Sequence, residues 1–157
     1  MDQLQPTASQ QPLIMITGAN GFVGRRLSLH LHEHGFPLRL CTRRTWSLYE
    51  PKPADNSESK AEISYHCLGD FTAQNDWGSV LQEHSRVPDV VIHCAARVHV
   101  MNDTAADPLA AFRAVNRDLS LQLAQQAAAA GVKQFIYLSS VKVNGEQTQA
   151  GHPFRET

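Results

Sequence analysis

Short runs of apolar residues recur along the chain, with room for a helix or a turn between them. The runs cover residues 13–17, 38–41, 63–68, 89–94 and 134–139. Most of them are continuous rather than alternating, which is typical of strands buried on both faces of a parallel sheet. The pattern therefore predicts five strands.

The segments between these runs carry helix signals. Residues 22–34 have apolar side chains at helical spacing, and residues 72–84 form a predicted helix that Thr72 caps. A long alanine- and leucine-rich helix begins at Pro108 and ends before Gly131. Strands that alternate with helices indicate an α/β fold. Right-handed crossovers arrange it as a doubly wound parallel sheet, the Rossmann arrangement, with five strands and flanking helices.

The composition indicates one globular domain. The chain has 157 residues, of which 42% are hydrophobic and 18% are charged, and its formal net charge is -1. This charge gives no field that would attract nucleic acid or an anionic membrane, so neither is expected as a partner. The polar N-terminal stretch lacks the blocks of a signal peptide, and no apolar run reaches membrane-spanning length. We therefore expect a cytoplasmic protein.

Cysteine and histidine residues do not indicate a metal site. Cys41, Cys67 and Cys94 are widely separated, and each lies near the end of an apolar run, where free cysteine packs as a small hydrophobic residue. His30 and His34 share one helix face, but a solvated helix end explains them without a metal ion. We expect no metal ligands in this chain.

The first predicted strand leads into a helix through a glycine-rich turn. Gly18 can take the tight turn, Gly21 lets the backbone approach a phosphate group, and Gly24 allows the helix to pack on the strand. The N–H groups of Phe22 and Val23 lie in the first helical turn, at the positive end of the helix dipole. Three glycines at this spacing also occur in plain loops. The buried strand before them and the amphipathic helix after them favour a site for the pyrophosphate of NAD(H) or NADP(H).

The end of the second strand bears on which dinucleotide binds. An acidic residue there would accept hydrogen bonds from the ribose 2′-hydroxyl of NAD, and this chain has none at that place. It has Arg43 and Arg44, whose guanidinium groups can pair with the 2′-phosphate of NADP or stack on adenine. NADP(H) is therefore favoured over NAD(H), and exposed loop arginines are the alternative interpretation.

Four motifs follow one another in an order that is typical of a known family. They are the glycine turn from Thr17 to Gly24, the run His93-Cys94-Ala95-Ala96, Asn116 within a helix, and the run from Phe135 to Ser140. With these motifs the chain resembles the extended short-chain dehydrogenases/reductases, and within them the NAD(P)-dependent nucleotide-sugar epimerase/dehydratase group. The resemblance extends over residues 14–145.

The resemblance implies roles for the matching positions. It implies that Asp70 and Phe71 lie near the adenine, that Ala95 and Ala96 line the nicotinamide side, and that Asn116 steadies the site. Without the resemblance, Asp70 is explained as a turn residue and Asn116 as an ordinary polar position in a helix.

Ser140 matches the catalytic serine of this family. The resemblance implies that its hydroxyl hydrogen-bonds the reacting sugar oxygen, beside a tyrosine that exchanges the proton. Ser140 follows a predicted strand directly, at the carboxyl edge where ligands bind in such folds. A serine that only closes a strand is the alternative. Lys142 and His99 are further candidates for contacts with substrate.

The chain departs from the family pattern after Ser140. The family's Tyr-x-x-x-Lys pair should follow it, but no tyrosine follows Tyr137. The lysine lowers the pKa of the tyrosine and holds the ribose, so we expect this chain to bind cofactor weakly and to turn nothing over. We expect a flexible tail over residues 1–12, an NAD(P)-binding Rossmann domain over 13–145, and a loop over 146–157 leading to a missing C-terminal part.

A closer similarity rests on residues 96–101 and 141–146. These segments look like bacterial enzymes of surface-polysaccharide assembly that act at C4 of UDP-N-acetylhexosamines as 4-epimerases or 4-reductases. The resemblance implies the cofactor-binding part of a nucleotide-sugar epimerase or reductase that acts by hydride transfer at the sugar ring. The small-molecule partner would be a nucleotide sugar, and a homodimer is a further expectation. The alternative is a non-catalytic NAD(P)-binding sensor or regulatory module that lacks the tyrosine and the lysine.

Overall fold

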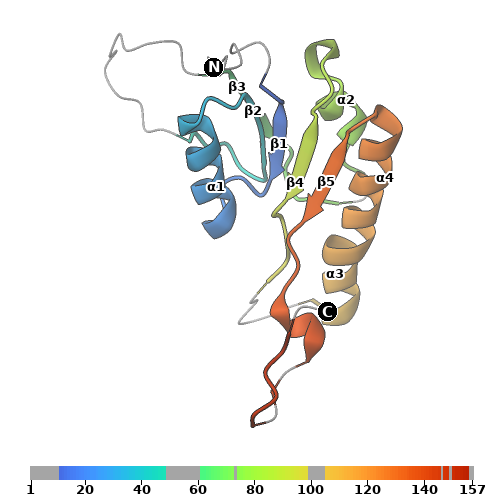
Figure 1. The fold of residues 1–157 in the computed structure, drawn as a ribbon. Helices are drawn as coiled ribbons and strands as arrows, with labels where there is room; N and C mark the ends of the chain where they lie inside the picture. The colour runs from blue at the N-terminus through green and yellow to red at the C-terminus, as the bar shows by residue number, and fades with distance from the viewer. Residues whose placement is uncertain are drawn as a thin grey trace, which may run out of the picture.

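A parallel five-stranded sheet forms the centre of the molecule in the computed structural model (Figure 1). The structure describes residues 11–48, 61–72, 74–98, 105–145, 147–148 and 150–155. The strands are β1 (Ile14–Thr17), β2 (Leu38–Thr42), β3 (Ile63–Cys67), β4 (Val90–His93) and β5 (Gln134–Tyr137). Their order across the sheet is β3-β2-β1-β4-β5, so the chain runs outward from β1 in one direction and then returns to continue in the other. This order confirms the doubly wound α/β fold predicted from the sequence.

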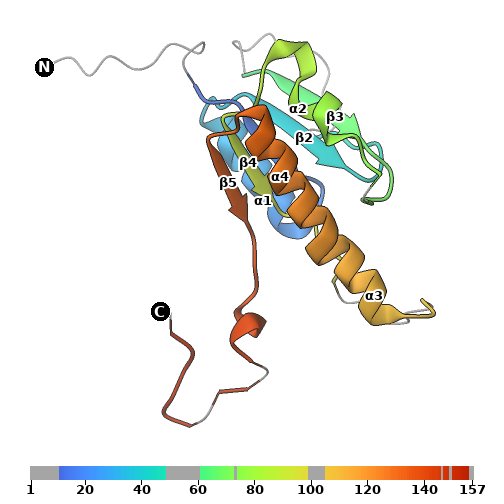
Figure 2. The ribbon, with the colours of Figure 1, turned by 90° about the vertical axis from the view of Figure 1, so that its right-hand side faces the viewer.

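Helices cover both faces of the sheet and give the molecule three layers (Figure 2). They are α1 (Phe22–Glu33), α2 (Trp77–Leu81), α3 (Pro108–Arg113), α4 (Ser120–Ala130), the 3-10 helices η2 (Glu83–Ser85) and η4 (Val141–Asn144), and the π-helical segment η3 (Ala114–Leu119). The leucines of α1 pack on one face of the sheet, around Ile14, Ile16 and Leu40. Trp77 of α2 and Leu123 of α4 pack on the other face.

The second helix differs from the prediction. It spans Trp77–Leu81 rather than residues 72–84, and Asp76 caps it by accepting a hydrogen bond from the N–H of Ser79 (3.1 Å). Thr72 is not the cap, because it lies in a preceding turn that Asn75 organises. The side chain of Asn75 accepts the N–H of Thr72 and donates to the carbonyl of Leu68, so the chain becomes helical only after this turn.

The parallel register brings the carboxyl ends of the strands to one edge of the sheet. Thr17, the last residue of β1, is paired with Cys41 on one side and with His93 on the other. The segments that leave β1, β2 and β4 therefore start from neighbouring positions, and this edge is where a doubly wound sheet binds ligands. Cys67 lies at the end of the edge strand β3 and is exposed, whereas we expected it to pack as a small hydrophobic residue.

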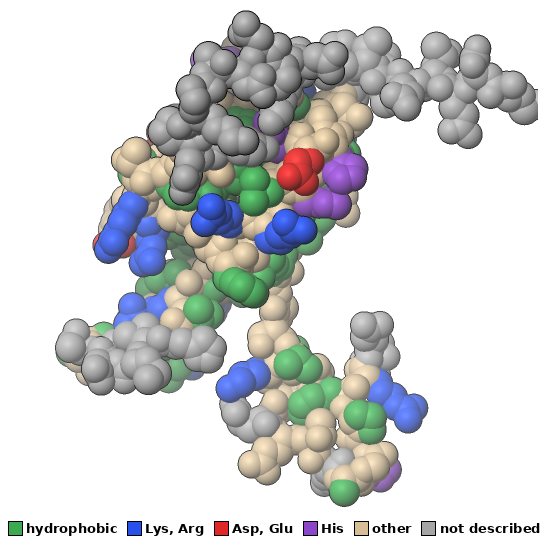
Figure 3. Space-filling model, turned by 90° about the vertical axis from the view of Figure 1, so that its left-hand side faces the viewer, with side chains coloured by type: hydrophobic (Ala, Val, Ile, Leu, Met, Phe, Trp, Pro, Cys, Tyr) green, Lys and Arg blue, Asp and Glu red, His purple; other side chains and the backbone are tan. Residues whose placement is uncertain are grey.

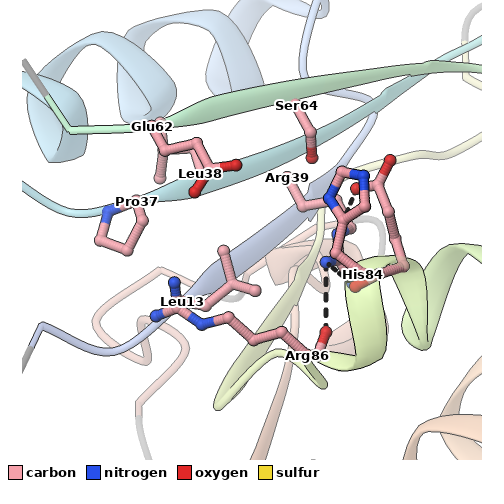
Figure 4. Close-up of a pocket in the computed structure, with 9 residues that line it drawn as sticks. Leu13, Pro37, Leu38, Arg39, Glu62, Ser64, His84 and Arg86 are labelled. Atoms are coloured by element: carbon pink, nitrogen blue, oxygen red, sulfur yellow. Dashed lines mark hydrogen bonds and ion pairs between the residues drawn. The ribbon is translucent and has the colours of Figure 1, made fainter. Parts of the chain in front are cut away.

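A buried arginine joins β2 to the end of α2 (Figure 4). Arg39 is only 3% exposed, and its Nη1 donates to the carbonyls of Val80 (2.7 Å) and Leu81 (3.1 Å). Its Nη2 donates to the carbonyls of Glu83 and Arg86, both at 3.2 Å, and Nε lies 3.2 Å from a carboxylate oxygen of Glu83. One guanidinium thus satisfies four carbonyls of a turn that contains His84 in the left-handed region, at φ 51°.

Candidate functional site

The glycine turn after β1 is built so closely that side chains do not fit at two of its positions. Gly18 has φ +67°, and a Cβ there would lie 2.8 Å from backbone atoms of Ala95, at the end of β4. A Cβ on Gly24 would lie 2.2 Å from the carbonyl oxygen of Gly18. Both distances are shorter than real Cβ contacts allow, so glycine is required at both positions.

The start of α1 presents free backbone donors. Gly21 is the N-cap, its N–H donates to the carbonyl of Gly18 (2.9 Å), and no side chain caps the helix. The first bond of the helix runs from the N–H of Arg25 to the carbonyl of Gly21 (2.9 Å). The N–H groups of residues 22–24 precede this bond and have no carbonyl within the helix to bind. Together with the helix dipole they form a site suited to an anionic group.

A pocket of about 480 Å³ opens beside this turn, at the carboxyl edge of the sheet. It is lined by Gly18, Asn20, Gly21, Arg43, Asp70, Phe71, Thr72, Cys94, Ala95, Ala96, Arg97, Val98 and Val115. Seven residues predicted from the sequence lie together in this wall: Gly18, Gly21, Arg43, Asp70, Phe71, Ala95 and Ala96. The segments that follow β1, β2, β3 and β4 all contribute to it, although they are far apart in the sequence.

Phe22 and Val23 direct their side chains elsewhere. They line a separate apolar hollow of about 650 Å³ on α1, with Arg26, Leu27 and His30. The side chain of Phe22 is 98% exposed. The α1 side of the molecule carries basic, histidine and apolar side chains near one another (Figure 3). Only the backbone N–H groups of Phe22 and Val23 are therefore candidates for the phosphate site, as the sequence suggested.

The two predicted arginines are placed differently. Arg43 lines the pocket, and its Nη1 lies 3.9 Å from a carboxylate oxygen of Asp70. Both side chains are more than two-thirds exposed, so this ion pair is weak and both groups remain accessible to a ligand. Arg44 does not line the pocket, and its carbonyl accepts a hydrogen bond from Oγ1 of Thr42 (2.7 Å).

Asn116 holds the loop that follows Ala96. Its side-chain Oδ1 accepts the N–H of Arg97 (2.7 Å), and its Nδ2 donates to the carbonyl of Arg97 (2.9 Å). Asn116 belongs to the π-helical segment η3, an irregularity that is frequent at functional sites. It does not line the pocket itself. It fixes the backbone of Arg97, which does line the pocket. The guanidinium of Arg97 lies 5.4 Å from the ring centre of Phe112.

Ser140 lies beyond β5, in a segment that extends away from the sheet (Figure 1). It is the N-cap of η4, and its hydroxyl accepts the N–H of Lys142 (3.2 Å). Ser140 and Lys142 are exposed and are not among the described residues that line the pocket. His99 lies outside the described residues. The structure thus brings seven of the twelve predicted cofactor residues together in the pocket wall and leaves the predicted catalytic serine apart from them.

His93 belongs to one of the four sequence motifs, and the sequence predicts no role of its own for it. It is fully buried, its Nδ1 lies 2.5 Å from Oγ1 of Thr17, and its Nε2 lies 2.9 Å from Oγ of Ser120. The N–H of Ala95 donates to the same Thr17 hydroxyl oxygen (3.4 Å). A polar residue within an apolar strand, in register with a threonine of the neighbouring strand, was the signal that could have found it.

Burial of His93 makes stability depend on pH. Desolvation lowers the pKa of His93 from 6.5 to about 4, so the folded chain keeps this ring neutral at pH values where the unfolded chain protonates it. The free energy of unfolding should therefore fall by roughly 3 kcal/mol as the pH drops from 7 to 4. Urea unfolding across this range, with His93→Asn as a variant that cannot titrate there, measures the contribution. Parallel pH profiles for the two proteins would contradict it.

Among the residues that the structure describes, no cluster of histidine, cysteine and acidic side chains could hold a metal ion. In the same part of the chain, no helix is long and apolar enough to cross a membrane.

Known proteins resemble this chain in sequence and in fold. It is 38% identical over 144 residues to the UDP-glucose 4-epimerase of Vibrio cholerae, a match that covers 90% of this chain and 39% of that protein. The chain therefore spans about two fifths of this relative. A UDP-glucose-4-epimerase structure from Stenotrophomonas maltophila, with bound NAD and formylated UDP-arabinopyranose, has the same fold (TM-score 0.64, 21% identity, 88% of this chain and 40% of that one). The Bordetella bronchiseptica enzyme WbmG, in complex with NAD and UDP, matches with a TM-score of 0.55 and 25% identity, over 79% of this chain and 36% of that one.

The model of the NAD dependent epimerase/dehydratase family matches residues 14–157, from the start of β1 through the glycine turn and the pocket to the segment beyond Ser140. The chain belongs to the NAD dependent epimerase/dehydratase family.

Proposed function

We propose that this chain is the dinucleotide-binding part of an NAD(P)-dependent nucleotide-sugar epimerase or reductase. The observation that carries the proposal is the pocket in which the glycine turn, at the N-cap of α1, meets the segments that follow β3 and β4. Membership of the family and the NAD bound in similar solved structures support it. The pocket volume of about 480 Å³ falls within the range of small-molecule sites, roughly 300–1,000 Å³.

The lining residues fit the parts of a dinucleotide. Gly21 and the N–H groups of residues 22–24 would hold the pyrophosphate, because Gly21 lines the pocket without a side chain and no side chain caps the helix. Asp70 and Phe71 would contact the adenine, and Ala95 and Ala96 would line the nicotinamide side. Asn116 would keep that wall in position through the backbone of Arg97. When bound, the cofactor would supply hydride exchange with the sugar ring.

A titration of the 157-residue chain with NADH tests the proposal. Isothermal titration calorimetry is expected to give one binding site, with a dissociation constant of roughly micromolar to millimolar size, or about -8 to -4 kcal/mol. A chain that is folded by circular dichroism and releases or absorbs no heat with NADH or NADPH would contradict the proposal.

We further propose that NADP(H) is preferred to NAD(H), on account of Arg43. Its guanidinium lies at the pocket wall at the end of β2, where the 2′-phosphate of the adenosine ribose would be placed. Arg44 does not line the pocket, so it would attract the 2′-phosphate from outside the pocket wall. The neighbouring Asp70 would exchange its weak pairing with Arg43 for contacts to the adenine.

Replacing both arginines with alanine should weaken NADPH binding by about tenfold or more, because a charge-assisted pair to phosphate is lost, and should leave NADH binding nearly unchanged. Calorimetric titration of each cofactor gives the ratio. Arg113→Ala, on the exposed side of α3, is the matched control and should change neither affinity. Equal losses for NADPH and NADH in the double variant would refute the preference.

The substrate would be a UDP-sugar, with UDP-N-acetylhexosamines as the proposed subclass and Ser140 as the proposed group that hydrogen-bonds the reacting sugar oxygen. Ser140 is exposed and free of the pocket wall, so it would need to move toward the nicotinamide side to act. Because the chain has no tyrosine after Tyr137, binding rather than turnover is the readout. A calorimetric titration of the NADH-loaded chain with UDP-N-acetylglucosamine, compared with Ser140→Ala, tests this, and equal affinities would contradict the role of Ser140. A Tyr-x-x-x-Lys pair encoded within about thirty residues after Thr157 would support the enzyme, whereas a stop codon there would support a non-catalytic NAD(P)-binding module.

A further inference from the structure

A chain of buried hydrogen bonds crosses the sheet directly beneath the pocket. It starts at Ser120, the first residue of α4, passes through the ring of His93 on β4, and reaches Thr17 at the end of β1. Thr17 is followed by Gly18, the first residue of the glycine turn, and it also accepts the N–H of Ala95 (3.4 Å). These hydrogen bonds therefore join the two walls of the pocket, which are the glycine turn and the end of β4.

The donors and acceptors in the chain favour one orientation of its hydrogens. The backbone N–H of Ala95 can only donate, so Oγ1 of Thr17 acts as its acceptor. The hydroxyl hydrogen of Thr17 is then free to donate to Nδ1 of His93, which requires a ring that carries its single proton on Nε2. That Nε2–H donates to Oγ of Ser120. The neutral Nε2–H tautomer thus gives the hydroxyl hydrogen of Thr17, which is fully buried, an acceptor, and the opposite tautomer would not. The hydroxyl hydrogen left over belongs to Ser120, which is only half-buried.

Protonation of the ring would disrupt this arrangement. Both ring nitrogens would donate, and the hydroxyl hydrogen of Thr17 would lose its acceptor. The groups packed against the ring are aromatic: Tyr137 of β5 is stacked on it at 5.8 Å between ring centres, and Phe135 lies at 6.2 Å. Tyr137 is the titratable side chain among these contacts. Such surroundings favour the neutral ring.

We infer that His93 is a positioning residue for the dinucleotide site: as the neutral Nε2–H tautomer, held by Ser120, it fixes the glycine turn and the backbone of Ala95 relative to each other. This inference rests on the proposed function, and it extends the site to a residue of α4 that does not line the pocket. Ser120 is half-buried on the far side of β4 from the turn, and it acts through His93.

Replacement of Ser120 tests the inference from outside the pocket. Ser120→Ala removes the acceptor of the Nε2–H, and we expect NADH affinity to fall by about fivefold to tenfold, a change that corresponds to one lost hydrogen bond to a buried group. Ser120→Thr keeps a hydroxyl and should restore most of the affinity. His32→Phe, which removes another buried and hydrogen-bonded histidine near the C-terminus of α1, is the matched control. It should cost stability without lowering affinity.

The ring itself provides an independent readout. Long-range ¹H–¹⁵N spectra of the wild-type chain should show His93 with a protonated Nε2 and an unprotonated Nδ1 at pH 7, and Ser120→Ala should perturb these signals. A protonated Nδ1, or unchanged NADH affinity in Ser120→Ala, would overturn the inference. Equal losses of affinity in Ser120→Ala and His32→Phe would overturn it too, because affinity would then follow stability alone. If the wild-type chain bound no NADH, the proposed function would fail and the inference with it, whereas the other outcomes concern the inference alone.

Discussion

Gly21→Val is expected to raise the dissociation constant for NADH by at least about a hundredfold, because charge-assisted hydrogen bonds to a phosphate contribute roughly 1.5–3 kcal/mol each. Gly21 lines the pocket at the N-cap of α1, so a valine side chain would occupy the space in front of the free N–H groups of residues 22–24. Its φ of -74° is open to any residue. A Cβ there would lie 3.1 Å from the carbonyl oxygen of Gly18, so the turn must shift by a few tenths of an ångström. We expect the fold to persist with this local adjustment.

The comparison of Gly21→Val with the wild type must separate loss of NADH binding from loss of the fold. Calorimetric titration gives the affinity, and circular dichroism and urea unfolding give the state of the fold. Gly78→Ala, in α2 and away from the pocket, is the control and should bind NADH as the wild type does. Unchanged affinity in Gly21→Val would remove the glycine turn from the binding site.

Arg39→Met should lower the free energy of unfolding by about 3–5 kcal/mol, the usual cost of removing one partner from a buried ionic network. The guanidinium donates to four carbonyls at the end of α2 and pairs with Glu83, and methionine can do neither. Those carbonyls would lose their partners, and the turn at His84, which lies in the left-handed region, would lose the contacts that hold it.

Urea unfolding of Arg39→Met and Arg39→Lys measures this effect. Lysine keeps the charge but supplies fewer donors in a less suitable geometry, so its loss should be intermediate. Glu33→Gln, an exposed change at the end of α1, should leave stability nearly unchanged. A loss below about 1 kcal/mol in Arg39→Met would mean that water satisfies the carbonyls and that the network is not required.

The strand pattern was the most predictable part of the fold. Each of the five apolar runs coincides with an observed strand to within one or two residues at each end, and the glycine turn lies between β1 and α1 as expected. The helix before β4 was predicted too long, because the competing turn at Asn75 depends on a contact with the carbonyl of Leu68 seven residues away. Arg39 shows a similar limit. Its burial depends on carbonyls more than forty residues later in the chain, which no local pattern reveals.

The pocket was predictable at the positions where the backbone path requires glycine. Gly18 and Gly24 are needed because other chain segments pass within Cβ distance, and the spacing of the glycines signals this. The hydrogen bonds of His93 to Thr17 and Ser120 were not predicted, since they depend on the register of β4 against β1 and on the placement of α4. The separation of Ser140 from the pocket was not predicted either, because its position after a strand does not determine the path of the segment that follows.

We expect a dinucleotide to bind beside the glycine turn, at the carboxyl edge of the sheet. A map of ¹H–¹⁵N amide shifts during titration of the chain with NADH tests it most directly. We expect shifts concentrated at residues 18–24, 70–72 and 94–98, with little change near Arg39 of β2 and near Arg86, which follows η2. Shifts confined to the surroundings of Arg39, or no saturable shifts at the glycine turn, would contradict it.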